Sequence, residues 1–328
     1  MKNFTSIHDA PDVEQLVQQA FDFKKNPLSQ SDFGKGKTLG MVFFNPSLRT
    51  RMSTQKAAQN LGMNIISLNV NDGWQLEFED EVIMNGNKAE HIKEAAEVMS
   101  QFVDVLAVRS FPTLVDREKD YADFILQKFI QHASVPILSL ESATLHPLQS
   151  LADFLTIKEN QKTERPKVVL TWAPHPKALP QVVANSFCEW MDFADVDLTI
   201  THPKGYELSP IFSKNATIEY DQNRAFENAD FIYAKNWSSF NDYGKILSQD
   251  ENWKISSEKM ALTNNGKFMH CLPVRRNVVV DDSVLDNPNS LVIEQANNRT
   301  FAAQTVLFDL LKNKKTNHEK SKAISLHN

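Results

Sequence analysis

Cysteine is scarce in this chain of 328 residues, which has two, Cys188 and Cys271. The two cysteines stand far apart and lack the spacing of a disulfide framework, so we expect a reducing compartment. Cysteine and histidine also do not occur at the spacing of a zinc site. The sequence therefore predicts neither a disulfide scaffold nor a bound metal.

Long apolar runs and a surplus of positive charge are absent too. No apolar stretch approaches the roughly 20 residues that cross a bilayer, and Met1–Val13 is polar, unlike a signal region. The net charge of -6 and the pI of about 5.9 disfavour a dedicated nucleic-acid binder. We therefore expect a cytoplasmic protein that binds neither membranes nor nucleic acids. The fingerprint G-x-G-x-x-G is also missing, which argues against a Rossmann-type dehydrogenase.

The composition is that of a soluble globular protein, with 41% hydrophobic and 23% charged residues. A chain of this length usually exceeds one compact core, so the sequence predicts two domains, at residues 1–150 and 151–328. The polar stretch Glu159–Pro166 marks the change between the two halves.

Short apolar strands alternate with amphipathic helices along the chain. The expected strands are Lys37–Phe44, Met63–Val70, Val103–Val108, Val135–Leu140, Lys167–Trp172, Val196–Thr201, Asp230–Tyr233 and Lys267–His270. The expected helices are Asp12–Lys25, Arg49–Leu61, Ala89–Val103, Tyr121–His132, Leu148–Lys158, Pro180–Met191, Arg224–Asn228 and Phe301–Leu311. This alternation predicts an α/β fold of parallel sheets flanked by helices.

The first predicted strand is followed by a segment suited to an anion. Asn45 can cap a helix and Pro46 suits its first position, where free backbone N–H groups and the helix dipole attract negative charge. Ser47 and Thr50 add hydroxyl donors, and Arg49 adds a forked cation that matches phosphate. A capped helix with solvated arginines is the alternative, and this segment alone does not decide between them.

Other predicted strands also end near charged or polar side chains. In a parallel α/β fold, ligands bind beyond the carboxyl ends of the strands. The candidates are Arg109, Glu141, His146, Gln149, His175, Lys235 and the segment His270–Arg276, with Arg299 before the last helix. Their summed charge is positive within an acidic protein, which indicates an anionic small-molecule substrate.

Three motifs among these residues resemble one family. Ser47-x-Arg49-Thr50-Arg51, His146-Pro147-x-Gln149 and His270-Cys271-Leu272-Pro273 are similar, in order and spacing, to the aspartate/ornithine carbamoyltransferase family. The resemblance extends over the whole chain and implies the carbamoyltransferase fold. It implies a carbamoyl phosphate-binding domain at 1–150 and an amino-acid-binding domain at 151–328, with the C-terminal helix packing back on the first domain.

The chain departs from ordinary ornithine carbamoyltransferases in one segment. Their Asp-x-x-x-Ser-Met-Gly is replaced by Ala234–Ser238. The segments Thr171–Pro176, Ala261–Asn265 and Leu272–Arg276 resemble a narrower group, which carbamoylates ornithine whose α-amine carries an acetyl or a succinyl group. The similarity to the succinyl type is close. It implies that carbamoyl phosphate and N-succinyl-L-ornithine are the substrates, in arginine biosynthesis.

One position is expected to separate the two subgroups. Acetyl-type enzymes carry a glutamate just before the Glu-His-Ile helix, where succinyl-type enzymes carry a small residue or proline. The alignment puts Ala89 at this position, and a shift of one residue would put Glu90 there instead. Because alanine lacks the charge that would repel a succinyl carboxylate, it favours the succinyl substrate.

The resemblance also assigns roles to residues of this chain. Arg109, His146 and Thr50 are expected to be catalytic, the first two by stabilising an oxyanion on the carbamoyl group. The expected contacts of carbamoyl phosphate are Ser47, Leu48, Arg49, Thr50, Trp74 from a neighbouring subunit, Arg109, His146, Gln149, Cys271, Leu272 and Arg299. The expected contacts of the acylated ornithine are Glu141, His175, Lys235 and Arg275. No metal or organic cofactor is implied, and the assembly implied is a homotrimer with shared active sites.

Some assignments stay open at this point. Lys235 and Arg275 can each take either of two carboxylates, and Arg276 can bind substrate or, as we expect, form structural ion pairs. An enzyme of the same fold acting on N-acetylornithine, ornithine or another amine is one alternative. A non-catalytic anion-binding protein is another, although the presence of Arg49, Arg109 and His146 favours an enzyme.

Overall fold

The computed structural model describes residues 1–70 and 74–325, with side chains up to Lys312. The chain forms two compact units. The first unit comprises Met1–Phe111, Tyr121–Ser142 and the chain from Arg299 onward, and the second comprises Pro112–Asp120 and Ala143–Asn298. The division thus differs from a single cut after residue 150, because each unit is built from separate stretches of the chain.

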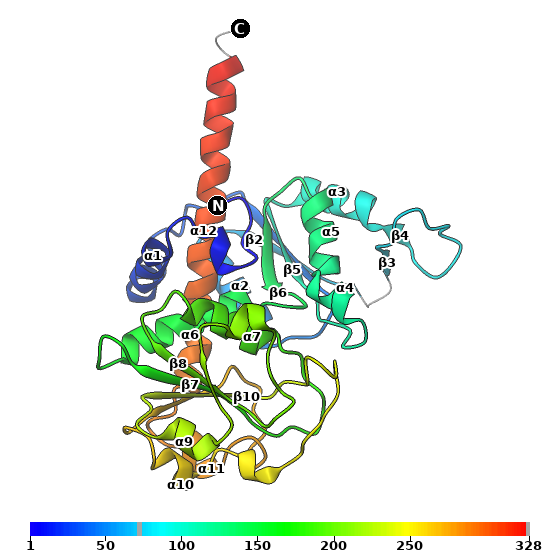
Figure 1. Ribbon diagram of the computed structural model, residues 1–328. Helices are drawn as coiled ribbons and strands as arrows, with labels where there is room; N and C mark the ends of the chain where they lie inside the picture. The colour runs from blue at the N-terminus through cyan, green and yellow to red at the C-terminus, as the bar shows by residue number, and fades with distance from the viewer. Residues whose placement is uncertain (71–73, 326–328) are drawn as a thin grey trace. The chain divides into compact units, whose positions relative to one another are not determined.

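Within the described residues, the first unit holds a parallel sheet of four strands in the order β2-β1-β5-β6. Figure 1 labels β2, β5 and β6 of this sheet. Its strands are β1 (Thr38–Phe43), β2 (Asn64–Asn69), β5 (Val105–Arg109) and β6 (Ile137–Glu141). Its helices include η1 (Ile7–Asp9), α1 (Val13–Lys25), α2 (Arg49–Asn60), α3 (Ile92–Phe102) and α5 (Phe124–His132). A short parallel pairing joins β3 (Leu76–Glu77) to β4 (Glu90–His91). Helices α4 (Arg117–Tyr121) and α12 (Val292–Ser325) each cross the division between the units.

The second unit holds a parallel sheet of five described strands in the order β11-β10-β7-β8-β9. The strands are β7 (Lys167–Trp172), β8 (Asp197–Thr201), β9 (Thr217–Glu219), β10 (Phe231–Lys235) and β11 (Lys267–Met269). The helices of this unit include α6 (Pro147–Asn160), α7 (Val182–Met191), α8 (Pro210–Ser213), α9 (Gln222–Phe226), η2 (Glu251–Trp253), α10 (Ser257–Met260) and α11 (Asp282–Leu285). The predicted fold class, two α/β domains with parallel sheets and flanking helices, is confirmed.

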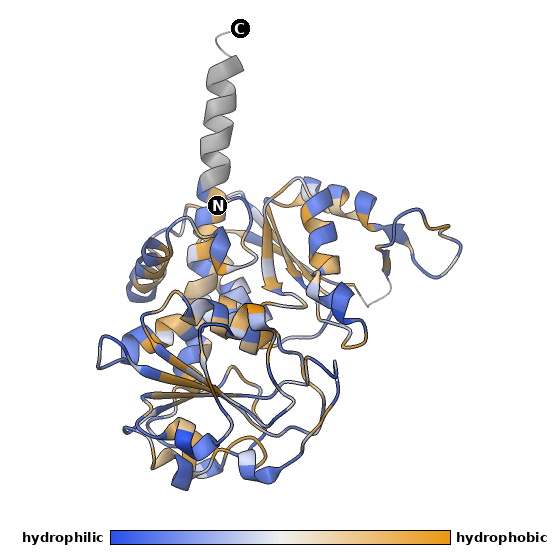
Figure 2. Cartoon of the chain, viewed as in Figure 1, coloured by the Kyte–Doolittle hydropathy of each residue, from blue (hydrophilic) through white to orange (hydrophobic). Residues whose placement is uncertain are grey.

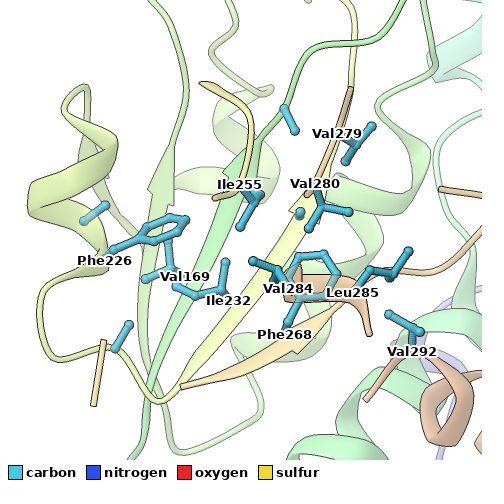
Figure 3. Packing of buried hydrophobic residues seen from close by; sticks show 14 residues of the cluster. Val169, Phe226, Ile232, Ile255, Phe268, Val279, Val280, Val284, Leu285 and Val292 are labelled. Carbon is cyan, nitrogen blue, oxygen red and sulfur yellow. The ribbon is translucent and has the colours of Figure 1, made fainter. Parts of the chain in front are cut away.

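Each unit has its own apolar core. The strands carry mostly hydrophobic residues, whereas the surface helices mix hydrophobic and hydrophilic ones (Figure 2). In the first unit Val108 of β5 packs in one cluster with Ile92 of α3 and Phe129 of α5. In the second unit Phe268 of β11 lies close to Val284 and Leu285 of α11 (Figure 3). Burial of these apolar side chains stabilises the strands in place. Candidate residues such as Arg109 and Glu141 lie at the ends of these strands.

Several helices differ from the prediction: α4, α8, α10 and α11 were not predicted, and α5 begins at Phe124 rather than at Tyr121. Two further differences have identifiable causes. The helix predicted at Ala89–Val103 begins at Ile92, because Glu90–His91 pairs with β3 and the His91 ring accepts the Lys93 N–H at 3.2 Å. The closing helix begins at Val292 rather than at Phe301. Its first turns bury polar residues such as Gln295, so they lack the apolar stripe that identifies a helix in the sequence.

Candidate active site

The segment after β1 differs locally from its prediction. Helix α2 begins at Arg49 with Leu48 as its N-cap, so the predicted cap at Asn45 and first position at Pro46 are wrong. Instead, the Thr50 N–H donates to Ser47 Oγ at 3.3 Å. A serine three residues before this N–H therefore satisfies one of the free donors of the first turn. The remaining first-turn N–H groups follow Ser47 and stay suited to an anion.

Two buried arginines converge on Thr50. Arg109 Nη1 donates to Thr50 Oγ1 at 3.1 Å, and Arg299 Nη2 donates to the same oxygen at 2.6 Å. Arg109 is 6% exposed and Arg299 4%. We call Ser47, Arg49, Thr50, Arg109, Glu141 and Arg299 the Thr50 cluster. The three guanidinium groups and one carboxylate of this set give it a net positive charge in a largely buried place.

Glu141 is the carboxylate of the Thr50 cluster. It ends β6, pairs in register with Arg109 at the end of β5, and its Oε2 lies 2.6 Å from Arg109 Nη1. The Arg109 guanidinium also lies over the Phe111 ring, 4.6 Å from its centroid. Arg109 is thereby fixed from several sides, as a group that orients a ligand must be.

Arg51 belongs to the predicted motif, but its side chain contacts strand β2. Its guanidinium hydrogen-bonds to Ser67 and Asn69 of β2 and lies 4.0 Å from the centroid of the Phe43 ring. Arg51 therefore ties α2 to the edge of the sheet.

The predicted residues Trp74 and Ala89 lie on one small element of the first unit. Trp74 precedes β3, is 60% exposed, and donates from Nε1 to Glu90 Oε2 at 2.9 Å. Ala89 precedes β4, is exposed, and donates its N–H to the Gln75 carbonyl at 2.8 Å. The Glu90 carboxylate is thus held by Trp74, whereas the methyl group of Ala89 is open to solvent.

In the second unit, His146 and Gln149 lie at the start of α6 as predicted. His146 is the N-cap, Pro147 follows at the first position, and the His146 carbonyl accepts the Gln149 N–H at 3.0 Å. Both side chains are buried. Gln149 donates from Nε2 to Asp153 Oδ1 at 2.7 Å.

The third motif forms a tight turn after β11. The Leu272 N–H donates to His270 Nδ1 at 2.8 Å, and the His270 N–H donates to Gln295 Oε1 at 3.0 Å. Leu272 has a φ of 55°, and the Leu272–Pro273 peptide bond is cis. Cys271 is buried beside the Tyr233 hydroxyl. His270 therefore serves the turn as a structural acceptor.

His175, Lys235 and Arg275 form a second set of basic side chains. Arg275 Nε donates to His175 Nε2 at 3.0 Å, which requires a neutral imidazole. Burial lowers the pKa of His175 below its ordinary value, and the charges of Arg275 and Lys235 lower it further. His175 and Arg275 line a cavity of about 270 Å³ together with Pro174, Gln249, Lys254 and Asn277. Sequence patterns gave no sign of Gln249 or Lys254, because they lie in a long irregular segment.

Arg276 takes the structural role expected of it. Its guanidinium pairs with Asp282 at 2.8 Å and with Asp286 at 2.6 Å, on the protein surface. These contacts lower the pKa of both aspartates, because the guanidinium donates hydrogen bonds to their charged forms.

Two further properties concern metals and membranes. Among the described residues, no three His, Cys, Asp or Glu side chains gather closely enough to hold a metal ion. In the same part of the chain, no helix combines the length and the apolar character that crossing a membrane requires.

Models of one protein family match both halves of the chain. The model for the carbamoyl-P binding domain of aspartate/ornithine carbamoyltransferases matches residues 2–159. The model for the Asp/Orn binding domain of the same family matches residues 180–310.

Individual proteins agree with these matches. The N-succinylornithine carbamoyltransferase of Bacteroides fragilis (strain 638R) is 54% identical over 316 residues, 95% of this chain and 99% of its own. The N-acetylornithine carbamoyltransferase of Xanthomonas axonopodis pv. citri (strain 306) is 36% identical over 94% of this chain and 96% of its own. A solved structure is similar with a TM-score of 0.89 and 35% identity, over 94% of this chain and 100% of that one. It is a glutamate-to-alanine mutant of N-acetyl-L-ornithine transcarbamylase complexed with carbamyl phosphate and N-succinyl-L-norvaline. The chain therefore belongs to the aspartate/ornithine carbamoyltransferase family.

Proposed function

We propose that this protein transfers the carbamoyl group of carbamoyl phosphate to the side-chain amine of N-succinyl-L-ornithine, giving N-succinyl-L-citrulline and phosphate. The observation that carries the proposal is the pair of buried guanidinium groups on the Thr50 hydroxyl. Buried positive charge in excess of negative charge favours an anionic ligand. The 54% identity to an N-succinylornithine carbamoyltransferase supports this choice of acceptor.

The phosphate end of carbamoyl phosphate would bind at the start of α2. Ser47, Thr50 and the Leu48 N–H would donate hydrogen bonds, and Arg49 would supply a forked cation. Arg299, held against Thr50 at 2.6 Å, would complete the positive surroundings. We propose on this basis that the first unit contains the carbamoyl phosphate-binding domain and the second the acylornithine-binding domain.

The carbamoyl end would be held by Arg109 and His146 and by groups of Gln149, Cys271 and Leu272. Arg109 and His146 would donate to the carbonyl oxygen and stabilise the charge that develops on it. Gln149 and the carbonyls of Cys271 and Leu272 would accept from the carbamoyl NH₂.

The reaction then depends on how the two substrates are positioned and not on a dedicated base of the protein. The neutral side-chain amine attacks the carbamoyl carbon, a C–N bond forms, and the C–O bond to phosphate breaks. The leaving phosphate takes the proton released by the attacking nitrogen, so no protein base is required. Holding both reactants in line and stabilising the oxyanion would supply most of the acceleration.

The second substrate would be recognised by charge. N-succinyl-L-ornithine carries two carboxylates, and Lys235 and Arg275 offer two cations. Arg275 is oriented by its hydrogen bond to His175 Nε2. Glu141 would contact the substrate from the end of β6.

Acceptor choice would depend on Ala89. Its exposed methyl group brings no negative charge, and the neighbouring Glu90 carboxylate already accepts from Trp74. A glutamate at this position would repel the succinyl carboxylate. The related glutamate-to-alanine mutant structure, which contains an N-succinyl compound, supports this reasoning.

We also propose a homotrimer in which Trp74 enters the active site of a neighbouring subunit. The edge strand β2 exposes Ile66 and Leu68, and nearby in sequence Met52 and Trp74 are exposed as well. Exposed apolar groups along a sheet edge favour association between copies. We assign the protein to the cytoplasm, since two buried cysteines that form no disulfide fit a reducing compartment, and to arginine biosynthesis.

The test is formation of a ureido product from carbamoyl phosphate and N-succinyl-L-ornithine, with release of phosphate. Arg109→Lys keeps the charge but loses the fork that reaches Thr50 and Glu141, so we expect it to abolish most activity. Arg276→Lys, at a surface ion pair, is the matched control and should stay active. Equal activity of the two variants would refute the role of Arg109. Absence of product from the wild-type protein would favour a non-catalytic anion-binding protein.

A further inference from the structure

A buried carboxylate connects the motif His146-Pro147-x-Gln149 to the motif His270–Pro273. Asp153 lies on α6, one turn after Gln149, and is 0% exposed. Its Oδ1 accepts two hydrogen bonds at 2.7 Å, one from Gln149 Nε2 and one from Gln295 Nε2. Gln295 comes from the first turns of α12. A charge this deeply buried is costly, so its donors are required for the fold to hold it.

The other end of Gln295 reaches the third motif. Gln295 Oε1 accepts the backbone N–H of His270 at 3.0 Å. A backbone N–H can only donate, so the oxygen of the Gln295 side-chain amide must face His270. The NH₂ group of the same amide must then face Asp153. One carboxylate is thereby connected both to the Gln149 side chain and to the turn that contains Cys271 and Leu272.

The same logic fixes the Gln149 amide. A carboxylate accepts hydrogen bonds, so the NH₂ end of Gln149 faces Asp153 and Oε1 faces away from it. Gln149 is 1% exposed, and among the described residues no group donates to its Oε1. A buried carbonyl oxygen without a donor is costly, and a ligand N–H would satisfy it. The NH₂ of a carbamoyl group is such a donor.

Tyr233 adds a further neighbour to this carboxylate. Burial and the negative charge of Asp153 raise the pKa of Tyr233 well above its ordinary value, so its hydroxyl stays protonated. The same hydroxyl lies near Cys271. Gln149, Gln295 and Tyr233 are thus polar neighbours of Asp153 that can donate to it, and the last two lead to the turn that contains Cys271 and Leu272.

We propose that Asp153 is a positioning residue for the carbamoyl group. It holds Gln149 with its carbonyl oxygen presented to the ligand, and through Gln295 it holds the turn whose carbonyls accept the other hydrogen. The proposal rests on the proposed function, since it assumes that carbamoyl phosphate is the ligand. Asp153 itself contacts no substrate atom in this account.

The test compares Asp153→Asn with the wild-type protein in binding of two ligands, carbamoyl phosphate and inorganic phosphate. An asparagine can both donate and accept, so Gln149 loses its fixed orientation. We expect the Kd of carbamoyl phosphate to rise about tenfold, while the Kd of inorganic phosphate, which lacks the carbamoyl end, stays unchanged. Asp120→Asn is the matched control: Asp120 is a buried aspartate of the second unit that holds Thr113, Leu114 and Tyr243. It should leave the ratio of the two Kd values unchanged.

A double variant tests whether Asp153 acts through Gln149. In a Gln149→Met background, Asp153→Asn should raise the Kd of carbamoyl phosphate by clearly less than tenfold, since one of the two groups that Asp153 orients is gone and only the route through Gln295 remains. If Asp153→Asn does not fold, Gln295→Met breaks the same network and should weaken carbamoyl phosphate but not phosphate. A tenfold effect that persists in the Gln149→Met background, or equal weakening of both ligands, would overturn the proposal. Failure of the wild-type protein to bind carbamoyl phosphate would refute the proposed function instead.

Discussion

Thr50→Val removes the hydroxyl on which two guanidinium groups converge while keeping the shape of the side chain. Arg109 and Arg299 each lose a hydrogen bond in a place that water reaches poorly. A hydrogen bond to a charged group contributes about 1.5–3 kcal/mol, and two bonds to one atom are not additive. We expect the free energy of unfolding of the first unit to fall by about 2–4 kcal/mol. Binding of inorganic phosphate should weaken as well, since the arginines are no longer held in place.

Thr50→Ser is the control for this substitution, because it keeps the hydroxyl and removes one methyl group. Its expected cost is about 1 kcal/mol, the value of a buried methylene. The assay is denaturant unfolding of the two variants and the wild-type protein, followed by titration with phosphate. If Thr50→Val were as stable as Thr50→Ser and bound phosphate as tightly, the Thr50 cluster would not be an anion site.

The other predictions concern the choice of acceptor substrate, the stability of the protein at low pH and the packing of the core of the second unit. Ala89→Glu should shift the preference in kcat/KM from N-succinylornithine toward N-acetylornithine; an unchanged ratio would refute the role of this position. Burial lowers the pKa of His175 below its ordinary value of 6.5, so the unfolded chain takes up a proton first and stability falls as the pH drops below that value. His175→Gln should flatten this loss in melting curves between pH 7 and pH 5, and a pH dependence equal to that of the wild-type protein would contradict it. Phe268→Ala should cost about 3–5 kcal/mol of unfolding free energy, because the side chain is enclosed in the core of the second unit; a loss below about 1 kcal/mol would contradict that packing.

Apolar periodicity predicted the longer strands, because their pattern depends on the side chains themselves, and it missed the short strands β3, β4 and β9. Lys167–Trp172 was predicted with the bounds that β7 has. The predicted helix Arg49–Leu61 begins where α2 begins, but the cap assigned to Asn45 and the first position assigned to Pro46 were wrong, since the chain turns first and Ser47 accepts the Thr50 N–H. The start of α12 was missed because Gln295 and Asn298 are buried through hydrogen bonds, which no hydrophobic pattern records.

The sequence indicated candidate residues by type and position, but it predicted few of the contacts between them. Strand ends indicated Arg109 and Glu141, but their ion pair follows from the register of β5 and β6. Asp153 was not recognised, since an acidic residue within a helix usually faces water. Its role depends on Gln295, which lies far along the chain and meets it only in the folded structure.

The central claim is carbamoyl transfer to an acylated ornithine with a succinyl preference. The most direct measurement is kcat/KM for ureido formation from carbamoyl phosphate with N-succinyl-L-ornithine, N-acetyl-L-ornithine and L-ornithine in parallel. We expect the largest value for N-succinyl-L-ornithine, since Lys235 and Arg275 suit two carboxylates and Ala89 adds no negative charge. A larger value for N-acetyl-L-ornithine or L-ornithine, or no ureido product with any of the three, would contradict it.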